Sequence, residues 1–398
     1  MKILLVHNFY QSSSPSGEDA VFRNEHELFK KNGIDVITYE KNNDEIKDYG
    51  LWDKFLLSFK NIWSRKTHIG LKQLLRKEKP DIAHFHNIWY LITPSAYFAC
   101  KDAGVPVVQT LHNFRMFCVN GLLLRHGKVC EECIGHLPWR GVKYGCYSNS
   151  RLYSLPVAVT EGIHSFAGTW QDKVDAYIAL TEFGKKKFIE CGLPEEKIFV
   201  KPNFLLNPPE PSFAHRDYII FLGRLSHEKG LSILIDSAKV LNNSGLPLKF
   251  KIVGDGPLMK ELEDKVKAEK INGIEFTGRK TFHECMELLR DARFMIMPAV
   301  CYENFPMAIR EAFACGKPVI ASNLGAMAEL VDDGKTGLLF EPGDPEDLAA
   351  KIRWMLENHD ACIAMGKNAR KEFEEKYSAE KNFGKLIEIY NKLIAHSS

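Results

Sequence analysis

The sequence predicts an α/β protein with two Rossmann-like, doubly wound domains that face each other across a cleft. Short runs typical of buried strands alternate with amphipathic helical patterns, as they do in parallel sheets covered by helices. With 398 residues, 45% of them hydrophobic, the chain is long enough for two or three domains with sizeable cores. A stretch rich in proline and asparagine at residues 200–216 interrupts the alternation and is predicted to link two domains.

The first half begins with a buried-strand pattern at residues 2–7, KILLVH. A turn-rich loop and a helix from about Ala20 to Asn32 are expected next, and Gly33 closes that helix. Strand, helix and strand at this spacing predict a parallel sheet. Further strands of this half are expected at residues 34–40, 81–87, 105–113 and 176–182.

The second half has the same alternation without repeating the sequence. Residues 218–230 and 248–257 each combine a strand with a glycine-rich turn, and more strands are expected at 274–280, 294–300 and 317–323. From about Pro345 to His396 the pattern is helical, with breaks expected at Gly366 and around Tyr377. The predicted domains are residues 1–202 with a cysteine-rich insertion at 114–150, residues 203–379, and a terminal helix at 380–398.

Composition restricts the classes of function. A formal net charge of +2 gives no general attraction to nucleic acid, so we expect no nucleic-acid partner. The apolar run after Met1 is too short for a signal peptide, and no run approaches the roughly eighteen residues of a membrane span. We therefore expect a cytoplasmic protein. Its ten cysteines should then be thiols, and a clustered set of them would indicate a metal site.

One stretch of the second half combines two carboxylates with a helix start. Glu303 and Glu311 lie eight positions apart, and Asn304 and Pro306 are expected to be the N-cap and a first-turn residue of the helix that carries Glu311. The unpaired N–H groups of a helix start favour a diphosphate, while carboxylates accept hydrogen bonds from sugar hydroxyls. Such pairs also arise by chance on exposed helices, but this combination suits a nucleotide sugar.

Together with AFACGKPVIA at residues 312–321, this stretch resembles the retaining glycosyltransferases of family 4. Their pattern is Glu, seven residues, Glu, a helix of small residues and G-x-P-V-I-A. The resemblance implies a GT-B fold, a donor site in the second domain, an acceptor side in the first domain, and a terminal helix that crosses back to the first domain. An ordinary outer helix of the second domain is the alternative for residues 380–396.

The resemblance extends over residues 219–345 and implies further roles. Arg224 and Lys229 match the G-R-L…K-G motif that neutralises the donor diphosphate, although an isolated pair of this kind would more often be solvated. Gly254 matches a V-G-x-G-P turn, and Arg279 follows a strand end that contacts the base in relatives. Ala326 departs from the family's G-G-x-x-E segment, in which it replaces the second glycine.

In the first domain the resemblance implies that His112 contacts the transferred sugar and that Gly17 lies near the diphosphate. Ser16 precedes Gly17 where relatives have a second glycine. His84 and His86 resemble an H-x-H strand end that would line the acceptor side. The implied catalytic residues are His112, Arg224, Lys229 and Glu303. The implied donor-binding residues are Gly17, Arg224, Lys229, Gly254, Arg279, Glu303, Asn304, Phe305 and Glu311.

These roles imply a retaining hexosyltransferase that moves a sugar from a UDP or GDP donor to a hydroxyl of a saccharide acceptor in bacterial-type surface polysaccharide synthesis. In the family, Glu303 would bind sugar hydroxyls and Glu311 the ribose diol, so we expect front-face displacement rather than a carboxylate nucleophile. No Asp-x-Asp motif follows a strand, so a catalytic metal is not required. The alternatives are a nucleotide-sugar hydrolase or epimerase, and a non-enzymatic zinc-containing binding module.

Residues 51–79 have a composition typical of a helix on an anionic membrane. Eight Lys and Arg accompany two acidic residues there. Large apolar residues recur among them at helical spacing: Trp52, Phe55, Leu56, Phe59, Ile62 and Trp63. A peripheral position on the inner membrane face and a lipid-linked saccharide acceptor would follow. An amphipathic helix packed on the first domain is the alternative.

The cysteine-rich insertion has the spacing of a structural zinc site. Cys130 and Cys133 form a C-x-x-C pair, and Cys118 and Cys146 flank it at similar distances along the chain. Four thiolates could therefore converge on one Zn²⁺ ion that would shape the acceptor side. Four free thiols are the alternative.

Overall fold

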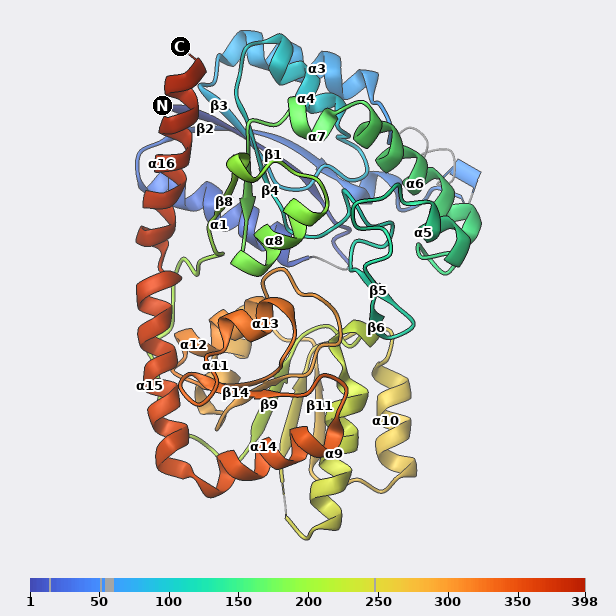
Figure 1. Ribbon diagram of the computed structural model, residues 1–398. Coiled ribbons are helices and arrows are strands. Elements are labelled where there is room, and N and C mark those ends of the chain that lie inside the picture. The colour runs from blue at the N-terminus through green and yellow to red at the C-terminus, as the bar shows by residue number, and fades with distance from the viewer. Residues whose placement is uncertain (14–15, 51, 54–60, 247, 398) are drawn as a thin grey trace. The chain divides into compact units, whose positions relative to one another are not determined.

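The computed structural model describes residues 1–13, 16–50, 52–53, 61–246 and 248–397, which divide into two compact units (Figure 1). Unit 1 comprises Met1–Leu123, Cys130–Asn203 and Ala379–Ser398, and unit 2 comprises Leu124–Val129 and Phe204–Ser378. Each unit is built on its own six-stranded parallel sheet. The prediction of two α/β, Rossmann-like domains is therefore confirmed.

The sheet of unit 1 has the strand order β2-β1-β3-β4-β7-β8. Its strands are β1 (Lys2–Phe9), β2 (Asp35–Asn42), β3 (Ile82–Phe85), β4 (Val107–Thr110), β7 (Ala176–Ala179) and β8 (Ile198–Val200). Its helices are α1 (Gly17–Lys31), α3 (Arg65–Glu78), α4 (Ser95–Asp102), α5 (Trp139–Tyr144), α6 (Arg151–Phe166), α7 (Thr169–Asp172), α8 (Glu182–Glu190) and α16 (Ala379–Ser397). Short 3-10 turns lie at Asn43–Ile46 and Glu195–Lys197.

Helix α1 begins three residues earlier than the sequence pattern predicts. Ser16 is its N-cap and accepts a hydrogen bond from the backbone N–H of Glu18. The Asp19 carboxylate in turn accepts from the backbone N–H of Ser16 at 3.1 Å. This capping box satisfies two N–H groups that would otherwise lack partners, and it fixes where the chain leaves the loop after β1.

The terminal helix α16 packs on unit 1, where Figure 1 shows it in red beside the N-terminal strands. Leu386, Ile389 and Tyr390 are buried in a cluster with residues of the sheet and α1, including Ile3 and Phe29. Among the described residues, no helix is both long enough and apolar enough to cross a bilayer.

The sheet of unit 2 has the strand order β11-β10-β9-β12-β13-β14. Its strands are β9 (Ile219–Leu222), β10 (Phe250–Val253), β11 (Ile274–Gly278), β12 (Met295–Met297), β13 (Val319–Ser322) and β14 (Gly337–Phe340). Its helices are α9 (Leu231–Asn243), α10 (Met259–Ala268), α11 (Phe282–Asp291), α12 (Met307–Ala314), α13 (Gly325–Leu330), α14 (Pro345–Glu357) and α15 (His359–Lys376). The turn at His227–Lys229 is a 3-10 helix, and the hairpin β5 (Leu124–Arg125) and β6 (Lys128–Val129) belongs to this unit.

The helical region at the C-terminus does not break at Gly366, which lies inside α15. A β-carbon at this position would lie 2.4 Å from the backbone oxygen of Gly316. Glycine therefore serves a close backbone approach here, and the helix is interrupted instead at Asn358.

We predict that Leu386→Ala destabilises unit 1, because Leu386 lies on the face of α16 that packs on this unit and is fully buried. Loss of the side chain should lower the free energy of unfolding by about 2–5 kcal/mol. The matched control is Lys385→Ala, which alters the neighbouring exposed residue of the same helix. Guanidinium unfolding followed by circular dichroism measures both. Equal unfolding curves for the two variants would contradict this packing of α16.

Candidate functional site

The sheet of unit 2 changes direction at β9. The chain adds β10 and β11 on one side of β9, and then adds β12, β13 and β14 on the other side. Side chains that follow β9 and β12 therefore meet at the carboxyl edge of the sheet, where ligands of such sheets bind. The loop after β9 carries Arg224 and Lys229, and the loop after β12 carries Glu303.

An ion pair joins these two loops. Nζ of Lys229 lies 2.5 Å from Oε1 of Glu303, and the side chains are 21% and 16% exposed. The backbone N–H of Val300 also donates to the carbonyl of Glu228 at 2.9 Å. Burial lowers the pKa of Lys229, but Glu303 outweighs this effect and the net shift is upward. The ammonium is therefore charged at neutral pH, and both groups remain accessible to a ligand.

Glu311 lies in α12 beside a buried arginine. The Arg310 guanidinium donates to Oε1 of Glu311 at 3.0 Å and to the carbonyl of Phe204. Burial raises the pKa of Glu311, and Arg310 opposes that shift. Only 13% of the Glu311 side chain is exposed, so one oxygen is held by Arg310 while the carboxylate keeps a limited opening to solvent.

The predicted capping of α12 is wrong. Pro306 is the N-cap and makes no side-chain capping bond, and Asn304 lies two residues before the cap. Proline fixes its own φ near the value found here, −67°, so the entry of the chain is set by the ring. Asn304 and Phe305 are buried in the loop that leads to α12.

Glycines let three strand-end loops of unit 2 touch. Gly254, after β10, has φ +142°, and a β-carbon there would lie 1.9 Å from the backbone oxygen of Gly223. Its N–H donates to the carbonyl of Gly278 at 3.0 Å, and the N–H of Gly223 donates to the carbonyl of Val253. The exposed Arg279 follows directly after β11. Arg224 is also exposed.

The predicted residues of unit 1 lie at the carboxyl edge of its own sheet, whose direction changes between β1 and β3. Gly17 is the first residue of α1, which follows β1. His112 follows β4, and its Nε2 lies 3.0 Å from Nδ1 of His86 at the end of β3. The two imidazole rings are stacked with centroids 5.3 Å apart.

His84 does not line an acceptor surface, which corrects the sequence-based expectation. Its side chain is fully buried in β3, with Nδ1 at 2.7 Å from the hydroxyl of Tyr390 and Nε2 at 2.7 Å from Oγ1 of Thr110. The residue points into the core because neighbouring strand residues alternate between the faces of a sheet and α16 covers this face.

Glu25, His84 and His86 form a group of ligand-type atoms that all lie within 4.8 Å of one another. Lys201, however, lies 2.6 Å from Oε1 of Glu25, so an ammonium already supplies the positive charge next to this carboxylate. Both nitrogens of His84 have protein partners. These contacts favour a hydrogen-bonded network over a metal centre.

The four cysteines predicted to bind zinc do not form a coordination shell. Cys118 is buried and its thiol lies 3.1 Å from Oδ1 of Asn120, while Cys130, Cys133 and Cys146 are partly exposed. Within the described ranges, no set of three or more ligand atoms lying within 4.8 Å of one another includes these sulfurs. This arrangement does not support the zinc site, which stays a prediction from spacing.

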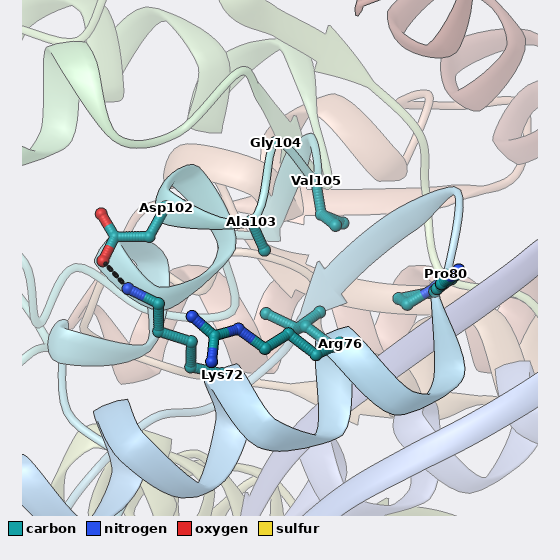
Figure 2. A pocket seen from close by; sticks show the side chains of 9 residues that line it. Lys72, Arg76, Pro80, Asp102, Ala103, Gly104 and Val105 are labelled. Atoms are coloured by element: carbon teal, nitrogen blue, oxygen red, sulfur yellow. Dashed lines mark hydrogen bonds and ion pairs between the residues drawn. The ribbon is translucent and has the colours of Figure 1, made fainter.

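A separate open pocket of about 470 Å³ lies at the amino-terminal edge of the unit 1 sheet, as Pro80 precedes β3 and Val105 precedes β4. Figure 2 shows Lys72 and Arg76 projecting from α3, with Lys72 bonded to Asp102 at 2.7 Å. The pocket lies at the edge opposite to the strand ends that carry His86 and His112. It therefore belongs to the basic side of α3 and not to the candidate site.

Sequence reasoning missed Glu25, Lys201 and Tyr390. Glu25 looks like a solvated residue of a polar helix, and Lys201 lies in the stretch predicted to be a linker. Both are fully buried. No local signal marks either residue as buried. The one hint for Lys201 is that its neighbours in the sequence are apolar, which is unusual in a solvated linker.

Two family models match the chain and together span most of it. The model described as Glycosyl transferases group 1 matches residues 207–372, which lie in unit 2. The model described as Glycosyltransferase Family 4 matches residues 26–205.

Individual relatives agree with these models. The chain is 37% identical over 330 residues to an uncharacterized glycosyltransferase of Methanocaldococcus jannaschii, covering 81% of this chain and 86% of the relative. It is 26% identical to WcaL of Salmonella typhimurium, named as a colanic acid biosynthesis glycosyltransferase, with coverages of 87% and 89%. The solved structure of Anabaena Alr3699/HepE in complex with UDP matches with a TM-score of 0.68 at 20% identity, covering 99% of this chain and 100% of that one.

We predict that Gly254→Ala destabilises the protein more than Gly343→Ala does. Both glycines have positive φ, but only at residue 254 would the new methyl group collide with backbone. The control should lose roughly 1–2 kcal/mol through the left-handed backbone alone, and the Gly254 variant more. Thermal unfolding midpoints compare them. Equal midpoints would contradict the close approach of the loops at residues 223 and 254.

Proposed function

The chain belongs to the glycosyltransferases of the GT-B fold, and from this premise we propose that it is a retaining enzyme whose donor is a nucleotide-diphosphate sugar. The observation that carries the proposal is the meeting of Lys229 and Glu303 at the direction change of the unit 2 sheet. A cation for the diphosphate and an acceptor for sugar hydroxyls are thus adjacent in one unit.

The ion pair supports a simple exchange on donor binding. Lys229 and Glu303 neutralise each other, so neither partly buried side chain carries an unpaired charge. A diphosphate competes for the ammonium, and Arg224 in the same loop adds a second, exposed cation. Glu303, released from Lys229, then accepts hydrogen bonds from hydroxyls of the transferred sugar.

Glu311 binds the ribose diol in this proposal. The contact with Arg310 orients the carboxylate, which lets its second oxygen accept from a hydroxyl. Gly254 allows the close backbone approach to Gly223 at the donor side of the sheet, and Arg279 lies at the next strand end, beside the base in this proposal. The start of α12 at Met307 adds partial positive charge for the diphosphate. Asn304 and Phe305 shape the loop that leads there.

Transfer proceeds on one face of the sugar. The departing diphosphate accepts the proton of the acceptor hydroxyl while Arg224, Lys229 and the start of α12 stabilise the charge that develops on it. In unit 1, His112 contacts the transferred sugar and the N–H of Gly17 approaches the diphosphate, as the family resemblance implies. A catalytic metal is not required in this proposal, because no Asp-x-Asp motif follows a strand. The sugar goes to a hydroxyl of a saccharide acceptor in polysaccharide synthesis, which the likeness to WcaL supports.

The acceptor is lipid-linked, and the protein binds the inner membrane face through the region before and within α3. Thr67, Leu71 and Leu75 on one face of α3 are buried, so this face packs within unit 1, as the alternative interpretation of the helix predicts. Its other side leaves Ile69 exposed beside basic residues, and Trp63 just before the helix is 44% exposed. Trp52 is also exposed, while Phe55, Leu56 and Phe59 lie outside the described residues.

Incubation with a panel of UDP- and GDP-sugars, with and without saccharide acceptors, tests the proposed activity. A transferase releases nucleotide mainly when an acceptor is present, and NMR of the product should show the same anomeric configuration as the donor. Release without acceptor would indicate a hydrolase, and an altered sugar still attached to the nucleotide would indicate an epimerase.

We predict that Glu311→Ala weakens binding of the cognate nucleoside diphosphate about ten- to a hundredfold, because a charge-assisted bond to the ribose is lost. Glu311→Gln keeps an acceptor for Arg310 and should have an intermediate effect. Glu287→Ala, which removes an exposed carboxylate of the same unit, is the control and should bind like the wild type. Calorimetric titration with UDP and GDP measures these affinities. Unchanged affinity in a folded Glu311→Ala protein would refute the assignment.

A second prediction concerns the membrane. Reversing two charges, Arg65→Glu with Lys66→Glu, should weaken binding to vesicles rich in phosphatidylglycerol by at least about tenfold, since each basic residue near such a surface contributes about 1 kcal/mol. The control Lys260→Glu with Lys267→Glu makes the same change in net charge on exposed residues of unit 2. Cosedimentation at low and high salt measures binding. Absence of salt-sensitive binding by the wild type would remove the membrane proposal.

A further inference from the structure

Helix α6 has a stripe of large apolar side chains on the side that faces solvent. These residues recur three or four positions apart along the whole helix, so they lie on one of its faces. Their exposed fractions are 56% for Leu152, 37% for Leu155, 43% for Ile163 and 93% for Phe166. The opposite face packs in unit 1 through residues such as Val157 and Ala158. The stripe is therefore not the side that holds α6 in the fold.

The segment around α5 extends this stripe. A β-carbon at Gly162 of α6 would lie 3.9 Å from Cδ2 of Leu137, so Leu137 reaches the outer side of α6. Figure 1 shows α5 beside α6 at the right of unit 1. Leu137 and Trp139 are each 49% exposed and Tyr144 is 41% exposed. We define the α5–α6 surface as the exposed apolar side chains of this region: Leu137, Trp139, Tyr144, Leu152, Leu155, Ile163 and Phe166. A gathering of exposed apolar side chains marks a place where another molecule binds.

The exposed charges around the α5–α6 surface are basic. Arg140, Lys143 and Arg151 are exposed. The one carboxylate between residues 133 and 171 is Glu161, which is 1% exposed because it lies on the buried face of α6. Apolar and aromatic side chains next to Lys and Arg are typical of a helix that lies on an anionic bilayer.

Charge also decides against a second copy of the chain as the occupant. In a symmetric dimer the same patch of both copies meets itself, so the basic side chains of the two rims would come together. Like charges facing each other disfavour such an interface. An anionic bilayer complements the same rim.

The stretch that leads to α3 is tied to α6. Nε2 of His164 lies 2.9 Å from the carbonyl oxygen of Ile62, and this nitrogen donates because a carbonyl only accepts. Nδ1 of the same buried ring lies 3.0 Å from the hydroxyl of Thr169. Trp63, the next residue after Ile62, is 44% exposed. The region before α3 and the α5–α6 region are thus joined within unit 1.

We propose that the α5–α6 surface is a membrane-docking surface, with α6 lying in the plane of an anionic bilayer and its exposed apolar side chains inserted among the lipid headgroups. Tyr147, three residues before the N-cap Ser150, contacts the hydroxyl of Tyr90 in the loop after β3. The surface therefore begins near the sheet edge that carries His86 and His112. Docking brings that edge to the bilayer, where a lipid-linked acceptor is located. This consequence rests on the proposed function, whereas docking itself is measurable without substrate.

Vesicle binding by the full-length protein tests the surface. Leu152→Ser with Phe166→Ser removes its two most exposed side chains without changing the charge. Binding to vesicles of phosphatidylglycerol and phosphatidylcholine should weaken at least about tenfold, because apolar area can no longer leave water. The control Phe282→Ser with Trp354→Ser removes two exposed apolar side chains of unit 2 and should bind like the wild type. Equal cosedimentation of the two variants, or no binding by the wild type, would overturn the proposal.

Photocrosslinking identifies what covers the surface. Phe166→benzoylphenylalanine, irradiated with the same vesicles, should give a lipid adduct that mass spectrometry detects. Phe282→benzoylphenylalanine is the control and should give none. A covalent dimer of the chain in place of the lipid adduct would assign the surface to a second copy and refute membrane docking.

Sugar transfer separates this inference from the proposed function. The Leu152→Ser, Phe166→Ser protein should transfer sugar to a water-soluble saccharide acceptor at the rate of the wild type, because both substitutions lie on the solvent side of α6. A matching loss of this activity and of vesicle binding would indicate damage to unit 1 and count against a docking role. If the wild type transfers no sugar, the proposed function fails, while vesicle binding and crosslinking still decide the docking surface.

Discussion

Parallel strands all end at the same edge of their sheet, and the chemistry of both units depends on this constraint. In unit 2 it places the loops after β9 and β12 side by side, where Lys229 and Glu303 form their ion pair. In unit 1 it brings His86 and His112 into contact from two neighbouring strands. Neither pair is close in the sequence. The first pair lies where the strand order of unit 2 changes direction, and the second lies at the adjacent ends of β3 and β4.

Close backbone contacts make the edge of unit 2 rigid enough to hold such a pair. The loops that follow β9 and β10 bond to each other and to the end of β11 through main-chain groups, and the approach of residues 223 and 254 excludes any side chain at residue 254. Main-chain contacts of this kind are insensitive to side-chain rotamers. The loops therefore present Arg224 and Lys229 from a fixed base, which preorganised electrostatic stabilisation requires.

In unit 1 the main electrostatic constraint is the carboxylate of Glu25, which is fully buried. An uncompensated charge there would cost several kcal/mol, so Glu25 is tolerable only because Lys201 contacts it and Asn382 completes the set. These partners come from α1, from the chain after β8 and from α16. The network thus ties three distant segments of unit 1 together and leaves one end, His112, at the surface.

The sequence by itself determined the fold class and where chemistry could lie. Alternating strand and helix patterns predict the two parallel sheets, because burial periodicity is a local property of the chain. Glu303 and the basic residues at 224 and 229 follow strand patterns, so their placement at strand ends could be predicted, and Glu311 could be placed in the helix that comes next. Details of capping could not: Asn304 has a good capping side chain, yet Pro306 fixes the helix start.

Only the tertiary structure decided which distant residues meet. Glu25 and Lys201 are 176 positions apart, and His84 and Tyr390 are 306 apart, so no local pattern pairs them. The same holds for residue 366, whose glycine looked like a helix break and instead permits contact with Gly316. From sequence alone, a charged residue in a helical pattern is predicted to be solvated. Its burial depends on which other segment packs over it, and the local sequence does not show that.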